Sequence, residues 1–161
     1  MLVHLHKNSF MKLYRIFFFA PLFALSVSCI STRSTLKNVD NNAPIPQLTA
    51  DNRFVLTQIS TDSKYGFDMD YPVNVFFNDS KDEELNCKRY LNSLSGPNGE
   101  DITYTKTGIC CPFPSKNINT GGGFLAVYSI TYNGLKTPLV LHLNIYEKGL
   151  LLAPSGFTIK K

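Results

Sequence analysis

The sequence predicts a small α+β domain in which a single antiparallel sheet of about six strands carries one helix. Two observations predict this fold class. Short segments rich in β-branched and aromatic residues recur along residues 53–161, and the last three of them are separated only by tight turns. By contrast, only one segment in this range has apolar residues at helical spacing. The expected domain therefore spans residues 53–161.

The first part of this domain is expected to contain two strands joined by a loop. Residues 54–60 are rich in β-forming side chains, and residues 73–77 alternate in the way a half-buried strand does. The loop between them, residues 62–72, contains the aromatic side chains Tyr65, Phe67 and Tyr71. If exposed, this cluster is a candidate surface for stacking on a sugar or a peptide; if buried, it closes one end of the sheet.

The helix is predicted from its start signal and its periodicity. Ser80 is a candidate N-cap, and Glu83 three residues later completes a capping box. The residues expected to face the core recur at roughly helical spacing: Leu85, Cys87, Leu91 and Leu94. The sequence Gly96-Pro97-Asn98-Gly99 then ends the helix and turns the chain.

The remaining residues predict a strand, a long connection and a meander. Residues 102–106 alternate as a third strand, and residues 108–123 are expected to form an irregular connection. The strands 124–132, 139–146 and 150–153 follow, separated by Asn133-Gly134 and by Glu147-Lys148-Gly149. In the first two of these strands, alternation places the following residues on one face: Phe124, Ala126, Tyr128, Ile130 and Tyr132, and Leu139, Leu141, Leu143 and Ile145. Consecutive strands joined by tight turns form an antiparallel meander.

Residues 1–28 have the pattern of a secretory signal. Lys12 and Arg15 precede an uncharged run of 12 residues, 16–27, which is shorter than the ~20 residues that span a bilayer. The run ends at Ser28-Cys29, and this ending is similar to the signal of a bacterial lipoprotein. In that class the cysteine receives a diacylglycerol and becomes the first mature residue, so Cys29 is the expected lipidation site. The true start of translation is expected at Met11.

Residues 29–52 are polar and contain Pro44 and Pro46, so they are expected to form a flexible tether between the lipid and the domain. Surface-exported lipoproteins of some Gram-negative groups carry an acidic run after the lipidated cysteine, and the residues after Cys29 are not such a run. From the resemblance to lipoproteins we expect a lipid-anchored protein of the cell envelope, at the outer membrane and facing the periplasm. The anchor makes the membrane one partner, and an envelope protein or glycan is the other that we expect.

The charge of the mature chain argues against nucleic acid as a partner. The formal net charge of +4 includes three basic residues that precede Cys29, and without them 13 basic and 12 acidic residues remain. A nearly neutral surface gives no electrostatic attraction for phosphates.

Several segments together resemble one protein family. They are Thr61-Asp62-Ser63-Lys64-Tyr65-Gly66-Phe67 with Asp70-Tyr71-Pro72, Leu94-Ser95-Gly96-Pro97-Asn98-Gly99-Glu100, Cys110-Cys111-Pro112-Phe113, Gly134-Leu135-Lys136-Thr137-Pro138 and Asn144-Ile145-Tyr146-Glu147-Lys148-Gly149. The chain thereby resembles a family of small Gram-negative lipoproteins without an established function, which often carry the automatic label 2-dehydro-3-deoxyphosphooctonate aldolase. An aldolase of that kind is a barrel of about 250 residues, which a domain of 109 residues without alternating strands and helices does not form.

Three cysteines follow the lipidation site, and an oxidising compartment favours a disulfide among them. We expect Cys87 to pair with Cys110 or Cys111 and thereby to fix the long connection to the helix. The alternatives are reduced or buried thiols, a bridge between the adjacent cysteines, and a redox or nucleophilic site. The Cys-x-x-Cys spacing of thioredoxin-like motifs is absent.

No other catalytic, metal or cofactor site is predicted. His142 is the only histidine after the signal and is expected to be a solvated strand residue, because no metal-ligand spacing accompanies it. Asp68-Met69-Asp70 lacks the rest of a calcium loop, and the glycines at 121–123 lack the lysine of a P-loop. No Gly-x-Ser-x-Gly elbow occurs. The sequence therefore favours a non-enzymatic binding or scaffolding domain, and the alternative is a small envelope enzyme or thiol-dependent factor that uses the Cys110-Cys111 segment.

Overall fold

The computed structural model describes residues 34–76 and 84–161. The chain divides into two units, Met1–Ser31 and Thr32–Lys161, and the described residues all belong to the second. The signal at 1–28, the start at Met11, the lipidation site Cys29 and the capping box of Ser80 and Glu83 lie outside the described residues. Among the residues that are described, no helix is both long and apolar enough to cross a membrane.

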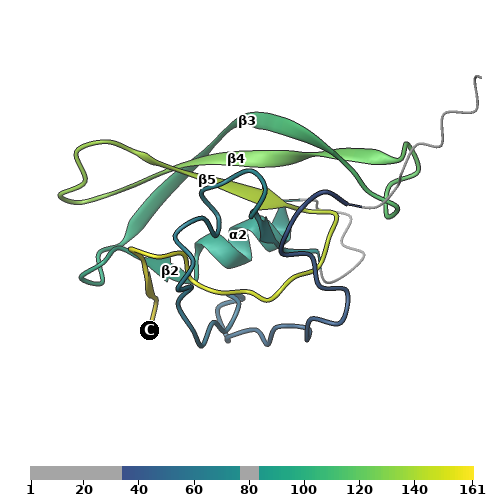
Figure 1. The fold of residues 1–161 in the computed structure, drawn as a ribbon. Coiled ribbons are helices and arrows are strands. Elements are labelled where there is room, and N and C mark those ends of the chain that lie inside the picture. The colour runs from purple at the N-terminus through teal and green to yellow at the C-terminus, as the bar shows by residue number, and fades with distance from the viewer. Residues whose placement is uncertain (1–33, 77–83) are drawn as a thin grey trace, which may run out of the picture. The chain divides into compact units, whose positions relative to one another are not determined.

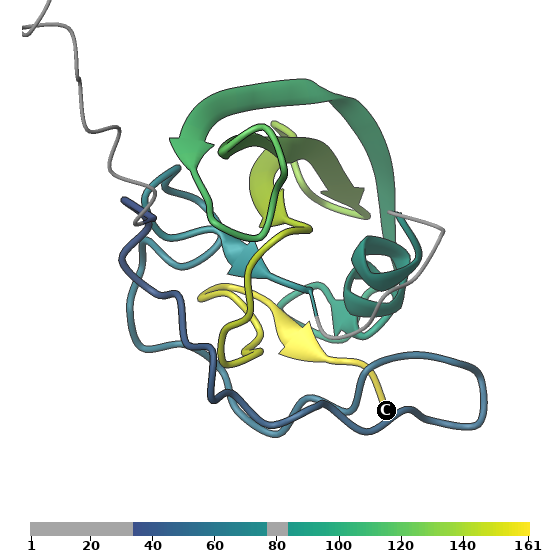
Figure 2. The same cartoon turned by 90° about the vertical axis from the view of Figure 1, so that its right-hand side faces the viewer.

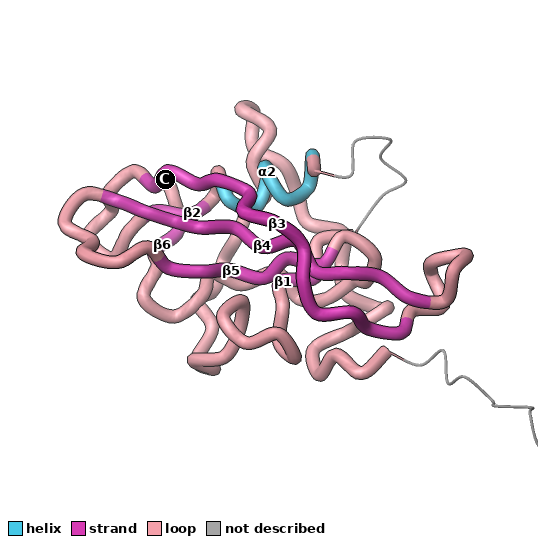
Figure 3. Tube along the Cα trace, turned by 90° about the horizontal axis from the view of Figure 1, so that it is seen from above, coloured by secondary structure: helices cyan, strands magenta, loops and turns pink. Residues whose placement is uncertain are grey.

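The second unit has two sheets and one short helix, and its fold is α+β as predicted (Figure 1). The larger sheet has the strand order β1-β5-β4-β3 (Figure 3), and its strands are β1 Val73–Asn74, β3 Ile102–Pro114, β4 Gly122–Tyr132 and β5 Leu139–Asn144. The smaller sheet pairs β2 Leu94–Ser95 with β6 Thr158–Ile159. The prediction of one six-stranded sheet is therefore wrong, since two separate ladders form.

The pairing of the larger sheet is antiparallel except at one edge. β3 with β4, and β4 with β5, are antiparallel neighbours. Only the β4–β5 pair belongs to the predicted meander, because its third member, residues 150–153, forms no strand. β1 runs parallel to β5, with Val73 opposite Leu143. A parallel neighbour needs a long crossover, and here the helix and the β3–β4 hairpin lie between β1 and β5 in the sequence.

The helix, α2, spans Leu85–Leu91 and lies beneath the larger sheet (Figure 1). Its inward side buries Cys87, Tyr90 and Leu91, and the Tyr90 hydroxyl donates a hydrogen bond to the Leu152 carbonyl at 2.8 Å. The predicted helix extends to Leu94, but α2 ends three residues earlier because Leu94 pairs with Ile159 in the smaller sheet. Tertiary pairing here outweighs the local helical pattern.

The main core lies between α2 and the concave face of the meander. Its sheet-side members are Ala126, Tyr128, Ile130, Leu141 and Leu143, all buried. The alternation of the sequence predicts these inward residues correctly, with the exception of Phe124, which is 49% exposed. Leu125 is buried instead, and it belongs to a second, smaller cluster.

Two segments predicted as strands pair only at single bridges. In the segment 54–60, Phe54 bridges to Leu48 and Ile59 bridges to Ala153. Phe54 and Leu56 are buried while Val55 between them is exposed, so the alternation of the segment is real. No strand among the described residues runs along it, however, and neither segment, 54–60 or 150–153, forms a strand.

The predicted connection at 108–123 is mostly strand. β3 continues to Pro114 and β4 begins at Gly122, and Figure 2 shows how strongly β3 curves over the sheet. The ladder between them contains two register shifts, one between Lys106 and Gly108 and the other between Cys110 and Phe113. Extra residues at such bulges bend a strand and increase its twist. The glycine and proline residues that suggest a loop therefore mark bulges inside a long hairpin.

The N-terminal segment 34–52 packs on the domain, whereas the sequence predicts a flexible tether over residues 29–52. Leu36 and Ala43 are buried, and the Lys37 amide donates to the Asp70 carbonyl at 2.9 Å. Asn74 donates through its side-chain amide to the Asn38 carbonyl at 3.0 Å, and Asn144 donates to the Asn74 side-chain oxygen at 2.8 Å. These few apolar and amide contacts hold a segment whose overall composition is that of a linker.

Candidate functional site

The predicted aromatic cluster does not form an exposed surface. Tyr65 is 5% exposed, and its hydroxyl donates to the Leu150 carbonyl at 3.1 Å. Phe67 is half-buried and stacks on Phe157, with 6.3 Å between the ring centroids. Tyr71 is half-buried under the Lys64 ammonium group, 5.9 Å from the ring centroid. Burial raises the pKa of Tyr65 well above its ordinary value, and the side chain is structural.

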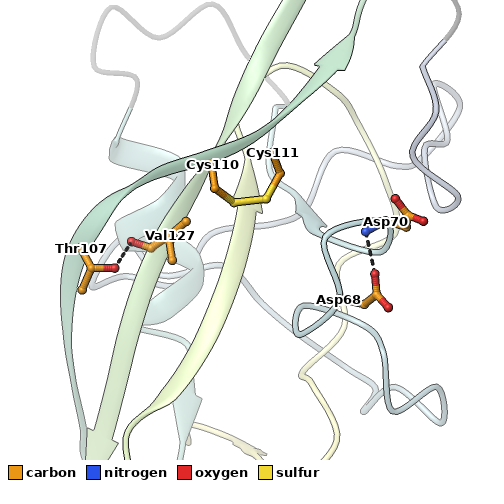
Figure 4. Close-up of a disulfide and its surroundings, with 6 residues drawn as sticks. All are labelled: Asp68, Asp70, Thr107, Cys110, Cys111 and Val127. Atoms are coloured by element: carbon orange, nitrogen blue, oxygen red, sulfur yellow. Dashed lines mark hydrogen bonds between the residues drawn. A yellow bond between two sulfur atoms is a disulfide. The ribbon is translucent and has the colours of Figure 1, made fainter.

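The predicted pairing of Cys87 is wrong. Cys87 is fully buried on α2 in the main core, and the sulfur atoms that lie at bonding distance are those of the adjacent residues Cys110 and Cys111 (Figure 4). Cys110 and Cys111 are half-buried and pack against the second cluster, which consists of Leu36, Phe113 and Leu125. Because Cys87 and the adjacent pair belong to different clusters, the long connection is not fixed to the helix through sulfur.

The backbone of β3 explains how two neighbouring side chains reach the same side. Successive residues of a regular strand point to opposite faces. Cys110 is paired with Leu125 and is the last residue before the second register shift, and Cys111 has a φ of +59°. This left-handed conformation costs a non-glycine residue about 1–2 kcal/mol. It breaks the alternation at Cys111 and lets the two sulfur atoms meet.

His142 lies beside this pair, although one strand, β4, separates their backbones. It is paired with Val127 across the β5–β4 ladder, and β3 is the next strand over. One imidazole nitrogen of His142 lies within 4.8 Å of both sulfur atoms. Neighbouring strands of a sheet are about 4.8 Å apart, so the side chains of β3 and β5 meet by reaching across β4. The predicted solvated histidine is in fact half-buried.

The imidazole of His142 has an unsatisfied polar atom. Its Nδ1 atom is buried and has no hydrogen-bond partner among the described residues. Its backbone is held firmly, because the amide donates to the Gly66 carbonyl at 2.8 Å. A buried polar atom without a partner destabilises the fold by about 1–3 kcal/mol. No local sequence signal indicates this juxtaposition, because it joins residues from β3 and β5.

A second candidate site is a pocket of about 750 Å³ against the N-terminal segment. Its lining residues are Ser34, Thr35, Leu36, Lys37, Val39, Asn41, Lys116 and Glu147. Glu147 is 3% exposed, and its two carboxylate oxygens accept hydrogen bonds from the Ser115 hydroxyl at 2.6 Å and the Asn117 amide at 2.7 Å. The sequence places Glu147 only in a turn, because nothing local shows that the β3–β4 loop folds onto it.

The two sites differ in chemistry. The pocket is lined by the ammonium groups of Lys37 and Lys116 and by the carboxylate of Glu147, which already accepts hydrogen bonds from neutral side chains. The sulfur–imidazole group holds the side chains with soft-ligand and redox chemistry. Comparisons with protein-family models, with curated proteins and with solved structures found no match, so the resemblance to the small lipoproteins stays a prediction.

Proposed function

We propose that the protein is a lipid-anchored protein of the cell envelope whose domain is a non-enzymatic binding module for an anionic glycan. The observation that carries the proposal is the pocket between the N-terminal segment and Glu147. Its volume of about 750 Å³ is typical of sites for small ligands. Lys37 and Lys116 supply charge for carboxylate or phosphate groups, and the hydroxyls of Ser34 and Thr35 supply neutral hydrogen bonds.

Glu147 supports binding rather than catalysis. A general base needs a carboxylate oxygen that is free to take a proton from a substrate. Both oxygens of Glu147 accept hydrogen bonds from the 115–117 segment, so the carboxylate fixes one wall of the pocket. A rigid wall reduces the entropy lost on binding.

The chain length connects the pocket to the proposed anchor. Ser34 lines the pocket and is five residues from Cys29. A fully extended chain of five residues spans at most about 18 Å. A lipid on Cys29 therefore keeps the pocket close to the membrane surface. The expected ligand is a glycan of the envelope that carries negative charge.

The test of the anchor is metabolic labelling with an alkyne fatty acid, followed by fractionation. The wild-type protein should incorporate the label and sediment with membranes, and Cys29→Ser should do neither. Unlabelled wild-type protein in the soluble fraction would contradict the proposal.

The test of the pocket is calorimetry of the full chain, purified in detergent, with charged fragments of the envelope glycan. The double variant Lys37→Glu, Lys116→Glu should bind at least about tenfold more weakly, because a charged hydrogen bond contributes ~1.5–3 kcal/mol. The double variant Lys136→Glu, Lys161→Glu is the matched control, since it makes the same charge change on two exposed residues that do not line the pocket. Equal weakening by the control would show that only net charge matters.

A second candidate function is a thiol-dependent factor that uses Cys110 and Cys111, and the contact between their sulfur atoms favours it. A partner dithiol attacks one sulfur through its thiolate, and the other leaves as a thiolate and takes up a proton. The partner's second thiol then resolves the mixed disulfide, so the protein is reduced and the partner is oxidised. Mass spectrometry after alkylation should find these two cysteines modified only after reduction. Modification of both in the oxidised protein would exclude this function.

A further inference from the structure

We propose that Cys110, Cys111 and His142 form a binding site for Cu(I), which is available only when the two cysteines are reduced. The inference uses the same residue pair as the thiol-dependent candidate and rests only on the pair being reducible. It is independent of the glycan pocket. The observations that carry it are the approach of three ligand atoms, the unsatisfied imidazole and the backbone that holds them.

The three candidate ligand atoms are already close together. The two sulfur atoms and one nitrogen of His142 all lie within 4.8 Å of one another. Metal–sulfur bonds of about 2.3 Å and metal–nitrogen bonds of about 2.0 Å place the ligand atoms of one ion roughly 3.5–4 Å apart. Side-chain rotations that move the atoms by about 1 Å are therefore sufficient to close the site around an ion.

The unsatisfied imidazole is an independent indication of a ligand. His142 is oriented by its backbone hydrogen bond to Gly66 and by its pairing with Val127. Its buried Nδ1 atom has no partner among the described residues, which is unusual for a half-buried polar ring. In metal sites, a histidine commonly binds the metal through one imidazole nitrogen and forms a hydrogen bond to the protein or to water through the other.

The donor set selects the ion. Two thiolates and one imidazole are soft or borderline ligands, which favour Cu(I) and Zn(II) over Mg(II) or Ca(II). Zn(II) in structural sites takes four protein ligands. The described histidine, cysteine, aspartate and glutamate residues contribute only these three atoms to the group. Cu(I) is stable with three ligands in a plane, so the site fits copper better than zinc.

Oxidation state controls access to the site. In the oxidised form the two sulfur atoms share a covalent bond, and neither is a thiolate. A dithiol reductant supplies two electrons and two protons to this bond and becomes a cyclic disulfide, which leaves two thiols. Binding of Cu(I) then displaces the thiol protons to solvent. The protein therefore holds the ion when reduced. It releases the ion when a partner disulfide accepts the two electrons of the thiolates, takes up two protons to become two thiols, and leaves the sulfur–sulfur bond between Cys110 and Cys111.

The decisive experiment is an anaerobic titration of the full chain with Cu(I) in competition with a chromophoric Cu(I) chelator. The protein is purified in detergent, reduced with a phosphine that is then removed, and compared with the same protein left oxidised. Reduced wild-type protein should bind one Cu(I) per chain and show thiolate-to-copper absorption in the near ultraviolet, and oxidised protein should show neither. Binding that is the same in both forms, or absent from the reduced form, would overturn the proposal.

Three variants test the assignment of the ligands. His142→Asn should retain the fold by circular dichroism and bind Cu(I) more than about tenfold more weakly. Cys110→Ser should lose the near-ultraviolet absorption. Cys87→Ala is the matched control, because it removes a cysteine that lies in the main core, and it should still bind one Cu(I). Unchanged affinity in His142→Asn, or loss of binding in Cys87→Ala, would contradict the site.

A titration with Zn(II) tests the choice of ion. Zn(II) should bind the reduced protein much more weakly than Cu(I) and should not displace it. Tighter binding of Zn(II) would overturn the copper assignment. Alkylation and mass spectrometry of the reduced sample, made before either titration, show whether both thiols are present, so a failure of reduction is distinguished from a failure of metal binding.

Discussion

The two ends of the β3–β4 hairpin show how one ladder serves two purposes. At the end near Tyr132, residues 102–106 pair with 128–132 in unbroken register, and the inward side chains build the main core. At the other end, two register shifts occur within 106–113, and the buried residues Phe113 and Leu125 belong to the small second cluster. The regular end supplies stability. The irregular end brings Cys110, Cys111 and His142 together.

The difference between the two ends shows that adjacent reactive side chains can meet only where a strand is irregular. A regular strand separates adjacent side chains to opposite faces, and such a strand never brings two neighbouring sulfur atoms together. A bulge with a left-handed residue, as at Cys111, removes this restriction at the expense of local stability. The main core compensates for the loss.

The largest expected loss of stability comes from a cavity at the regular end of the sheet. Leu141→Ala empties a fully buried position on β5 and should lower the free energy of unfolding by about 3–5 kcal/mol. Leu125→Ala at the irregular end should lower it by about 2–3 kcal/mol, because fewer buried neighbours surround the cavity. Urea denaturation followed by circular dichroism measures both. An equal or larger loss for Leu125→Ala would contradict the comparison.

The next effect concerns the amides that join the regular sheet to the N-terminal segment. Asn144→Ala removes the donor to the Asn74 oxygen and leaves that buried oxygen without this hydrogen bond. The free energy of unfolding should fall by about 1–3 kcal/mol. Thr107→Val is the control on the irregular hairpin, since it removes a hydrogen bond at 3.3 Å on an exposed residue and should cost less than about 0.5 kcal/mol.

The stability of the main core should also depend on pH, through the buried hydroxyl of Tyr90. Burial raises the pKa of Tyr90 in the main core well above its ordinary value. Because the folded pKa is the higher one, the tyrosine contributes full stability below about pH 10, and this stability is lost as the pH rises further. Unfolding free energies measured between neutral pH and pH 11 should therefore decline above pH ~10. Tyr90→Phe should be less stable at neutral pH by about 1 kcal/mol and should decline less steeply.

The smallest expected effect lies at the irregular end. Cys111→Gly relieves the left-handed conformation and, in reducing buffer, should change the free energy of unfolding by less than about 1 kcal/mol, in the stabilising direction. Cys110→Gly, at a position without positive φ, should destabilise by a similar amount. Thermal denaturation of the reduced proteins distinguishes them. A clear destabilisation by Cys111→Gly would show that its side-chain packing outweighs the backbone strain.

Local patterns in the sequence predict the parts of the fold that depend on neighbours along the chain. The alternation of Tyr128, Ile130, Leu141 and Leu143 places these residues in the core correctly, and Asn133-Gly134 lies at a turn. The parallel pairing of β1 with β5 and the separate β2–β6 ladder join residues that are 60 or more positions apart. No local pattern encodes such partners.

The candidate sites follow the same rule. Cys110 and Cys111 are conspicuous in the sequence, but their proximity to His142 depends on the pairing of β3 and β5 on either side of β4. The role of Glu147 depends on the β3–β4 loop, which places Ser115 and Asn117 against it. Composition alone assigns the segment 34–52 to a linker, because two buried side chains and a few amide contacts are too small a signal to outweigh its polarity.

The row of amides from Asn38 through Asn74 to Asn144 has a mechanical consequence. A pull on the chain ahead of Ser34 passes into the sheet through these side chains and through single backbone bonds such as that from Lys37 to Asp70. Each of these links is far weaker than the β4–β5 ladder behind it. Under load the leading segment would peel away first, lengthening the connection by several nanometres and opening the pocket while the sheet stays whole.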